Sequence, residues 1–435
     1  MNRWNMVPPL MVHQGELVLA RLTDHGHEAY FVGGCVRDEL MGRPVHDMDI
    51  ATSATPEEVV GLFERTVPTG IQHGTVTVLM EDCAFEVTTF RKEAEYEDHR
   101  RPSDVEYVRD LEQDLQRRDF TMNAIAMNQD GTIIDPYRGR QDIAAGVIRA
   151  VGSAAERFDE DALRMMRAVR FASVFGFRPS KSTWSGLRSC KDKIAFIAME
   201  RIRAELDKMM TGPRPLRGLE LLRRSGLLEY VNAPVPLAAI RQLNEEALSP
   251  WFVALEHAEA EPAEIRWSLL LQGLGVNGEE AEPLMKRWTF SRNMARRAAN
   301  LIRFDEMAHE LRADQPGSME EQRHQFIETT LRLGKETAAG WLKRKEALKR
   351  SRNEEDSAQE ESLEAGWFRD ITVFALPQLA VNGGDVIAAT GRKGGPWLTE
   401  LLNHLLLGVA SGDLRNERTA LLEQAKAVVN TYGHN

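Results

Sequence analysis

The chain has 435 residues, of which 43% are hydrophobic and 28% charged, enough for two to four compact domains with buried cores. Its three cysteines, at positions 35, 83 and 190, are too few and too scattered to predict a disulfide framework or a zinc site. The net charge of −11 argues, as a sum, against a nucleic-acid surface, and with no signal peptide or membrane-spanning apolar run we expect a cytoplasmic protein.

The first informative segment is Phe31-Val32-Gly33-Gly34-Cys35-Val36-Arg37-Asp38. An apolar pair, two glycines and the start of a helical pattern predict a strand, a turn and a helix. A glycine turn lets the backbone come close to a phosphate group and direct amides at it. We therefore expect Gly34 to lie against a triphosphate, with Arg37 adding a charged guanidinium.

A carboxylate pair follows in His46-Asp47-Met48-Asp49-Ile50. On an extended strand Asp47 and Asp49 would point to one side, while Met48 and Ile50 would turn into the core. Two hard oxygen ligands facing one spot suit Mg²⁺, and phosphoryl-transfer enzymes hold metal ions in this way. An Asp-x-Asp alone is common in turns, but in this order after the glycine turn it favours nucleotidyl transfer.

Two alternating segments, 74–79 and 84–90, have the pattern of β-strands. We expect them to pair across a turn at Glu81-Asp82. Glu86 would then lie on a strand that can neighbour the strand of Asp47 and Asp49. A strand glutamate that merely faces solvent is the alternative.

From Asp159 onward apolar residues recur at helical spacing, and the break at Gly212-Pro213 indicates a boundary. Between positions 162 and 210 there are eleven Lys or Arg against four Asp or Glu, a local balance of +7. This basic segment is where an RNA end would enter, the alternative being a solvated helix face. Segment 343–362 is dominated by charge and predicts a long exposed helix or a connection.

The glycine turn, Gly42, the Asp47-x-Asp49 pair and Ala51-Thr52 together resemble the head-domain signature of class II tRNA nucleotidyltransferases and bacterial poly(A) polymerases. Four further motifs of that family follow in order. They are Arg117-Arg118-Asp119-Phe120-Thr121-Met122-Asn123-Ala124, Asp135-Pro136-Tyr137-Arg138-Gly139, the Glu-Asp-x-x-Arg element within 157–171, and Glu200-Arg201-Ile202-Arg203-Ala204-Glu205-Leu206.

The resemblance implies an α+β fold class. A polymerase-β-like nucleotidyltransferase head, a mixed sheet with helices, would occupy 1–150. An all-α neck that reads the nucleotide base (151–212), a helical body (213–340) and a helical tail (341–435) would follow, the last two binding RNA. Segment 379–402 resembles the tail of Bacillus-type CCA-adding enzymes. Members of the family are often dimers, so a homodimer is one expectation that the sequence leaves open.

The resemblance also assigns roles to residues. Asp47 and Asp49 would be catalytic and hold Mg²⁺, and Glu86 is the candidate for the third carboxylate that often sits on such a strand in the wider superfamily. Arg118, Arg167 and Arg170 would join Gly34 and Arg37 in binding the triphosphate of ATP or CTP and stabilising the transition state. Asn123 would contact the sugar or have a structural role. Arg117 would bind RNA or stabilise the fold.

Asp161 and Arg164 correspond to the base-reading pair of the family. Three positions apart, they would be neighbours on a helix surface and present an acceptor beside a donor. Cytosine and adenine each offer an amino donor beside a ring acceptor, whereas uracil and guanine offer the reverse. The protein itself would then replace a template. An i,i+3 surface ion pair, worth about 0.3 kcal/mol, is the structural alternative.

These features predict an enzyme that adds C, C and A to the 3′ end of tRNA from CTP and ATP, with Mg²⁺ as cofactor and no membrane partner. Segment 93–101 resembles the flexible loop that family members require for the final A, which argues against an enzyme that adds only C. The alternatives are an A-adding enzyme, a bacterial poly(A) polymerase and, least favoured, a non-catalytic RNA-binding protein. Poly(A) polymerases typically carry a Gly-Arg-Arg-Phe-like segment where this chain has residues 69–76.

Overall fold

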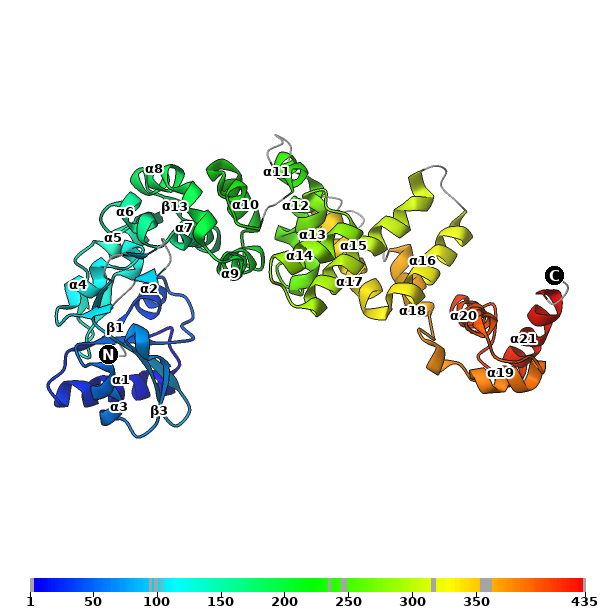
Figure 1. Ribbon diagram of the computed structural model, residues 1–435, viewed down its shortest axis with the longest axis horizontal. Helices are drawn as coiled ribbons and strands as arrows, with labels where there is room; N and C mark the ends of the chain where they lie inside the picture. The colour runs from blue at the N-terminus through cyan, green and yellow to red at the C-terminus, as the bar shows by residue number, and fades with distance from the viewer. Residues whose placement is uncertain are drawn as a thin grey trace. The chain divides into compact units, whose positions relative to one another are not determined.

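The computed structural model describes residues 4–93, 96–97, 101–102, 105–233, 236–243, 249–313, 318–352 and 362–432. The chain divides into two compact units, Met1–Pro236 and Leu237–Asn435, which are described separately below (Figure 1). The first unit contains a mixed sheet followed by helices, and the described part of the second is helical. The predicted fold class is therefore confirmed.

The first unit is built on a seven-stranded sheet with the order β11-β10-β1-β2-β5-β4-β3 in the described part of the chain. Only β2 and β5 are paired in parallel among these neighbours, and the other pairs are antiparallel. The strands are β1 Ala29–Val32, β2 Asp49–Thr52, β3 Thr66–Gly70, β4 Thr75–Leu79, β5 Ala84–Thr89, β10 Ala126–Met127 and β11 Ile133–Ile134.

The predicted hairpin is present, because β4 and β5 pair antiparallel with Val76 opposite Val87. The inner side chains of these strands are buried, and they pack with α1 (Pro9–Asp24) and α3 (Pro56–Leu62) in one apolar cluster. A second cluster includes Phe90 and Leu115, the latter on α4 (Leu111–Gln116). Apolar residues thus fix the sheet from both faces and leave its strand ends to carry polar groups.

The glycine turn forms the strand, turn and helix that the sequence predicts. Strand β1 ends at Val32, Gly33 has φ +73°, and α2 spans Gly34–Leu40. A side chain at Gly33 would be strained by this φ, and its Cβ would lie 2.8 Å from Nη1 of Arg118. Glycine is therefore required here both by backbone conformation and by the close approach of Arg118.

Short strands surround the segment expected to be a flexible loop. The pairs are β6 (Arg91–Glu93) with β9 (Val105–Tyr107) and β7 (Tyr96–Glu97) with β8 (Arg101–Pro102). Residues 94–95 and 98–100 of the loop lie outside the described residues, so its expected role in A addition stays a prediction.

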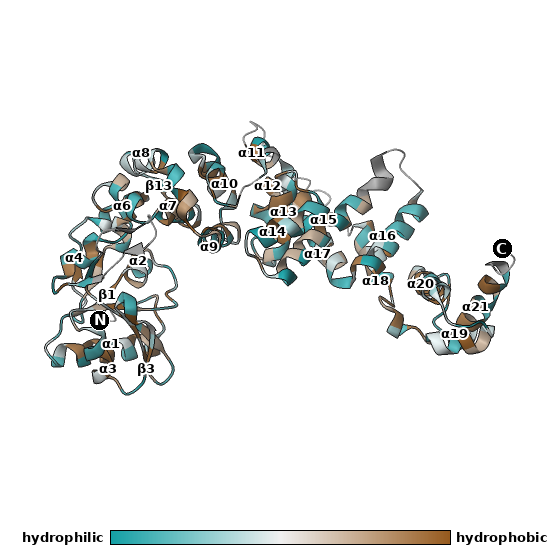
Figure 2. Ribbon diagram, in the orientation of Figure 1, coloured by the Kyte–Doolittle hydropathy of each residue, from teal (hydrophilic) through white to brown (hydrophobic). Residues whose placement is uncertain are grey.

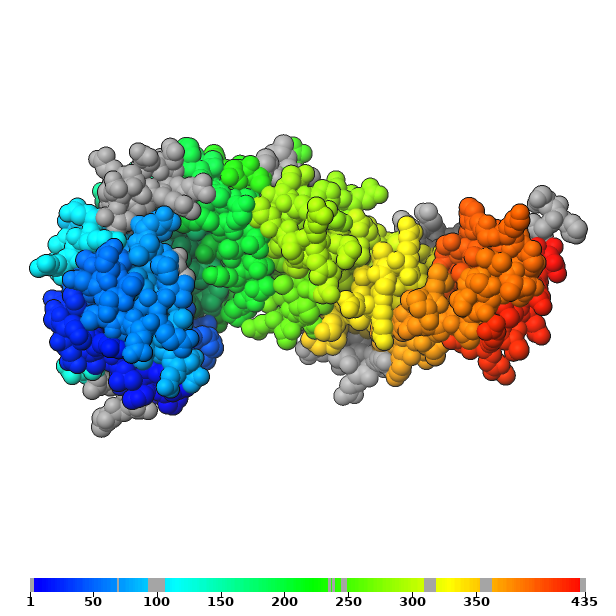
Figure 3. Space-filling model, turned by 60° about the horizontal axis from the view of Figure 1, so that its bottom comes forward, coloured from blue at the N-terminus to red at the C-terminus, as the bar shows by residue number. Residues whose placement is uncertain are grey.

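Helices follow the sheet within the first unit. Helix α7 packs against α9 and α10, and α6 packs against α8. In the space-filling view these segments run from cyan to green beside the blue sheet region (Figure 3). The elements are η2 Thr121–Asn123, α5 Gly139–Ala145, β12 Val147–Ile148, α6 Ala154–Glu160, α7 Leu163–Phe175, β13 Arg178–Pro179, α8 Lys181–Ser189, η3 Lys191–Phe196, α9 Met199–Met210, α10 Pro215–Ser225 and η4 Leu227–Glu229.

The second unit has an aromatic core, with Trp267 and Trp341 almost fully buried. Helix α13 is buried nearly all round and is coloured largely brown in Figure 2. The elements described here are α11 Leu237–Leu243, α12 Pro250–Ala254, η5 Glu256–Ala258, α13 Ala263–Gly273, α14 Gly278–Arg287, α15 Arg292–Ala313, α16 Met319–Leu333, α17 Lys335–Ser351, α18 Leu363–Asp370, η7 Leu376–Gln378, α19 Gly383–Thr390, α20 Pro396–Ser411 and α21 Arg418–Tyr432.

The charged segment 343–362 belongs partly to α17, whose described part ends at Ser351; residues 353–361 lie outside the described structure. The three cysteines are free thiols, and two of them, Cys35 and Cys190, are buried. None of the helices that the structure describes is long and apolar enough to span a membrane.

Candidate active site

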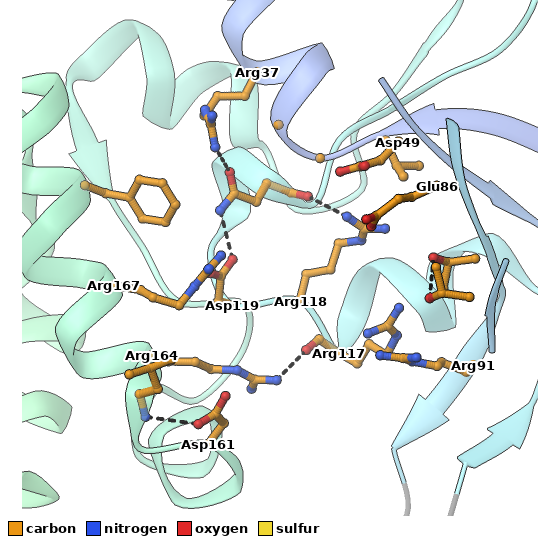
Figure 4. Close-up of a pocket in the computed structure, with 18 of the residues that line it drawn as sticks. Arg37, Asp49, Glu86, Arg91, Arg117, Arg118, Asp119, Asp161, Arg164 and Arg167 are labelled. Carbon is orange, nitrogen blue, oxygen red and sulfur yellow. Dashed lines mark hydrogen bonds and ion pairs between the residues drawn. The ribbon is translucent and has the colours of Figure 1, made fainter. Parts of the chain in front are cut away.

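A cavity of about 500 Å³ lies in the first unit between the sheet and α7 (Figure 4). It brings together every predicted site residue except Asp47. Its lining contains eight arginines and four acidic side chains, so it is strongly positive although the chain as a whole is acidic. The arginines are Arg37, Arg91, Arg117, Arg118, Arg164, Arg167, Arg170 and Arg201, and the acidic residues are Asp49, Glu86, Asp119 and Asp161.

The carboxylate strand is shorter than the sequence predicts, because β2 begins at Asp49. The expected alternation is nevertheless present. Met48 and Ile50 are buried, Asp49 is half-buried and Asp47 is exposed. Asp47 stands just before the strand, outside the cavity lining but close enough for its charge to act on Asp49.

Glu86 lies beside Asp49, as predicted from the strand pattern. Ile50 is opposite Val87 in the parallel pair of β2 and β5, so the preceding residues Asp49 and Glu86 share one level of the sheet. Burial, followed by the charges of Asp47 and Glu86, raises the pKa of Asp49 to about 6, against the opposing effect of Arg118 and Arg37. Negative charge is thus concentrated at one edge of the cavity.

The described residues contain no group of three His, Cys, Asp or Glu side chains already arranged around a metal position. The donor chemistry nevertheless fits Mg²⁺, which is commonly held by one or two carboxylates together with substrate phosphates. Asp49, with Asp47 and Glu86 close by, supplies carboxylate oxygens for a hard cation.

A chain of hydrogen bonds connects the first and second motifs. Arg37 Nη1 donates to Asn123 Oδ1 over 2.6 Å, and Asn123 Nδ2 donates to Asp119 Oδ1 over 2.9 Å. Arg167 continues the chain, since its Nε donates to Asp119 Oδ2 over 2.7 Å (Figure 4). Both ends of the Asn123 amide are therefore used within the protein, which favours the structural role over the sugar contact.

Asp119 supplies the negative charge in this series of hydrogen bonds. Burial alone would raise its pKa, but the Arg167 guanidinium, the hydrogen bond from Asn123 and the charge of Arg164 outweigh burial and hold the pKa at about 2. The carboxylate is consequently ionised over the whole physiological range.

Arg117 and Arg118 share a fully buried carboxylate, Asp114. Arg117 Nη2 lies 2.7 Å from Asp114 Oδ1, and Arg118 Nη2 lies 3.2 Å from Asp114 Oδ2. Burial opposes ionisation of Asp114, but these two arginines keep its pKa below the usual value. Arg117 thus anchors the fold and also lines the cavity, and Arg118 is held with its guanidinium near Gly33.

Asp161 and Arg164 are not neighbours on one helix, and that expectation is wrong. Asp161 is the residue after α6, in an extended conformation with φ −137°, and Arg164 belongs to α7. The alternative of an ion pair between them is not what the structure shows either. Asp161 Oδ1 accepts a hydrogen bond from the backbone N–H of Leu163, two residues on, over 3.0 Å, as in an Asx turn.

Arg164 is held by other partners. Its Nη1 donates to Glu160 Oε2 over 2.6 Å. Its Nη2 donates to the carbonyl of Arg117 over 3.0 Å (Figure 4). Asp161 Oδ2 accepts from Nη2 of Arg201 over 2.9 Å. The acceptor and the donor thus line the same cavity and are each positioned separately.

Phe171 of α7 lies among three guanidinium groups. Its ring centre is 3.8 Å from Cζ of Arg170, 5.3 Å from Cζ of Arg167 and 5.4 Å from Cζ of Arg37. A ring face attracts cations, so Phe171 offsets part of the repulsion among these arginines. Arg170 also pairs with Glu205 of α9. Three of the four predicted triphosphate-binding arginines, Arg37, Arg167 and Arg170, therefore gather around one ring.

The third motif has a supporting role. Asp135 Oδ1 accepts from the backbone N–H of Gly139 over 2.6 Å and Oδ2 accepts from that of Arg140 over 2.9 Å. A Cβ at Gly139 would collide with the carbonyl of Thr121. This motif thus fixes α5 against η2, the short helix that ends at Asn123.

Sequence reasoning did not assign several residues of the cavity. Arg201 lay within the fifth motif and Asp119 within the second, so motif membership was the available signal for both. Phe171 belonged to the fourth motif but was assigned no role from the sequence. Arg91 follows a predicted strand and belongs to none of the five motifs, so no sequence pattern indicated it. In the structure it lies on β6, which pairs with β9, and it lines the cavity.

Comparison with known proteins gives consistent similarities along the whole chain. The family model described as "Poly A polymerase head domain" matches residues 29–149. Residues 176–239 match "Probable RNA and SrmB- binding site of polymerase A", and residues 259–425 match domain 2 of tRNA nucleotidyltransferases.

Relatives cover nearly the full length. The chain is 39% identical over 423 residues to the CCA-adding enzyme of Geobacillus stearothermophilus, covering 95% of this chain and 96% of that one. It is 37% identical over 426 residues to the CCA-adding enzyme of Limosilactobacillus reuteri, covering 97% and 98%. A solved structure of Bacillus stearothermophilus CCA-adding enzyme in complex with CTP matches with a TM-score of 0.81 at 36% identity over 98% of this chain and 99% of that one.

A structure of Thermotoga maritima CCA-adding enzyme complexed with tRNA shares the fold, with a TM-score of 0.65 at 20% identity over 98% of this chain and 97% of that one.

Proposed function

Because the chain belongs to the CCA-adding enzyme family of tRNA nucleotidyltransferases, we propose that it adds C, C and A in sequence to the 3′ end of tRNA. CTP and ATP are the nucleotide substrates, and pyrophosphate leaves at each step. The observation that carries the proposal is the single cavity in which Asp49, Arg118, Asp161 and Arg164 meet.

In the proposed reaction the tRNA 3′-hydroxyl attacks the α-phosphate of the bound nucleotide. Asp47 and Asp49, with Glu86 as the third carboxylate, would hold Mg²⁺. When bound, this ion activates the attacking hydroxyl and neutralises charge on the leaving pyrophosphate. Burial, followed by the charges of Asp47 and Glu86, raises the pKa of Asp49, and these neighbouring carboxylates support a cation at this edge.

The arginine cluster would bind the triphosphate. Arg37, Arg118, Arg167 and Arg170 all line the cavity, and Gly34 starts the helix beside them. Guanidinium groups bind phosphate oxygens with two parallel hydrogen bonds, so several fixed arginines suit a group with three phosphates. They would also offset the charge that develops in the transition state.

Base selection follows from the chemistry of Asp161 and Arg164. An ionised carboxylate only accepts hydrogen bonds and a guanidinium only donates them. Cytosine and adenine satisfy this pair, whereas uracil and guanine would present an acceptor to Asp161 and a donor to Arg164, a mismatch at both groups. A site built to hydrogen-bond its substrate can reject a mismatch by on the order of 10⁴-fold.

We propose that the remaining helices bind the tRNA mainly through its shape and backbone. The match of residues 259–425 to tRNA nucleotidyltransferases and the basic segment 162–210 support this assignment. The division into head (1–150), neck (151–212), body (213–340) and tail (341–435), a homodimer and a cytoplasmic location also belong to the proposal. Sedimentation equilibrium of the purified protein tests the homodimer.

The test is incorporation by the purified protein with Mg²⁺ on tRNA transcripts that end at the discriminator base, at C or at CC. Each nucleoside triphosphate is supplied singly, and CTP and ATP together. Growth by C, C and A that then stops is the expected result. A addition only to the CC end would indicate an A-adding enzyme, and long A tails a poly(A) polymerase. Loss of incorporation with EDTA that Mg²⁺ restores would support the cation.

A further inference from the structure

The fifth motif lies on α9, which packs against α7 but was given no role by the sequence. Two of its charged residues, Arg201 and Glu205, are four positions apart and so share one face of the helix. Arg201 Nη2 donates to Asp161 Oδ2 over 2.9 Å, and Glu205 pairs with Arg170. The helix therefore contacts the base-reading carboxylate and one arginine of the triphosphate cluster.

Asp161 depends on such a contact because of its place in the chain. It is the first of the two residues between α6 and α7, and its backbone is extended rather than helical. Its Oδ1 accepts from the backbone N–H of Leu163, two residues on, which is a local contact. The partner of Oδ2, Arg201, comes from 40 positions away in the sequence.

The two contacts use different oxygens of one carboxylate. Together they define the plane of the carboxylate and hence the direction of its remaining lone pairs. A charge-assisted hydrogen bond is shorter and more directional than a neutral one. Loss of Arg201 would leave Asp161 held at one oxygen only and free to turn away from the base.

We propose that Arg201 is a positioning residue for base selection, which orients Asp161 so that it accepts from the amino group of cytosine or adenine. This inference rests on the proposed function. It predicts that Arg201 acts on the choice among nucleotides rather than on the stability of the fold.

The exposure of the pair supports that distinction. The side chains of Arg201 and Asp161 are 35% and 18% exposed, and Arg201 lines the cavity. Ion pairs between side chains with this exposure contribute little to the free energy of unfolding. Arg201→Gln should therefore fold, and its thermal unfolding should stay close to that of the wild type.

Arg217→Gln is a matched control. Arg217 on the neighbouring α10 makes an ion pair with Glu220 of the same length, 2.9 Å, at 34% exposure, and does not line the cavity. The substitution removes the same charge from a similar environment.

The experiment measures kcat/KM for CTP and UTP on a tRNA ending at the discriminator base, and for ATP and GTP on a tRNA ending in CC. Arg201→Gln should lower both ratios of correct to incorrect nucleotide by about tenfold or more, the size of one lost charged contact. Arg201→Lys should restore part of each ratio, and Arg217→Gln should leave both unchanged. In an Asp161→Ala background, Arg201→Gln should cause no further loss.

Unchanged ratios in Arg201→Gln, an equal fall in kcat/KM for all four nucleotides, or full additivity with Asp161→Ala would overturn the inference. These outcomes differ from failure of the proposed function, in which the wild-type protein itself would incorporate neither CTP nor ATP.

Discussion

Arg37 and Asn123 are 86 positions apart in the sequence, yet Arg37 Nη1 donates a hydrogen bond to Asn123 Oδ1 over 2.6 Å. The contact ties the helix after the glycine turn to the second motif. It also leaves Arg37 with its guanidinium in the cavity rather than in solvent. The cavity proposed to bind the nucleotide is thus assembled by polar contacts between motifs and not only by the sheet.

Asn123→Ala should weaken nucleotide binding without changing nucleotide choice. The substitution leaves Arg37 and Asp119 each without one hydrogen-bond partner in a buried site, at a cost of about 1–3 kcal/mol. We expect the KM for CTP and for ATP to rise together by roughly 10- to 100-fold. Steady-state kinetics checks this, and a rise for only one of the two nucleotides would point to a base contact instead.

Asp49→Ala should abolish catalysis while leaving substrate binding largely intact. Charge stabilisation by a bound metal is worth several kcal/mol, so kcat should fall by on the order of 10³-fold or more. Single-turnover incorporation measures the loss, and CTP binding by calorimetry is the control. Incorporation within tenfold of the wild type would contradict the assignment of Asp49.

Phe171→Leu should raise the KM for both nucleotides. The ring lies within 5.4 Å of three guanidinium groups, and each cation–π contact contributes about 0.5–2 kcal/mol. Leucine keeps the apolar packing but removes the ring face, so a KM increase of about tenfold is expected for CTP and ATP alike. Phe175→Leu serves as the control, because Phe175 contacts Arg37 and Arg43 but does not line the cavity. An equal effect of the two variants would refute a specific role for Phe171.

Asp119 should make stability sensitive to acid. The pKa of Asp119 is about 2 in the folded protein, against 3.8 for an aspartate without these neighbours. Ionisation of Asp119 therefore adds about 2–3 kcal/mol to the free energy of unfolding at neutral pH. This contribution is present above pH 3.8 and is lost as the pH falls toward 2, with roughly half left at pH 3. Urea unfolding of the wild type and of Asp119→Asn should therefore converge below pH 4. A difference that stays constant from pH 6 to pH 3 would show that Asp119 is not stabilised by ionisation.

Much of the site could be predicted because local patterns determine it. The glycine turn, the alternation around Asp49 and the hairpin that carries Glu86 each depend on residues close together in the sequence. Their ordered spacing then indicated one catalytic centre.

The features of the cavity that could not be predicted depend on contacts that exist only in the folded protein. The break between α6 and α7 occurs at Asp161-Ala162, where no glycine or proline marks it, and the hydrogen bond from Leu163 N–H to Asp161 becomes visible only in the structure. One partner of Asp161, Arg201, and one partner of Arg164, the carbonyl of Arg117, likewise come from 40 and 47 positions away. Periodicity alone placed both residues on one helix, because Leu163, Met166 and Val169 continue the apolar spacing past the break.

The measurement to make is the nucleotide preference of Asp161→Ala during C addition. If protein side chains in one cavity choose the nucleotide, kcat/KM for CTP relative to UTP should fall by about 10²-fold or more while some incorporation persists. A preference for CTP over UTP that stays at the wild-type value in this variant would contradict the claim.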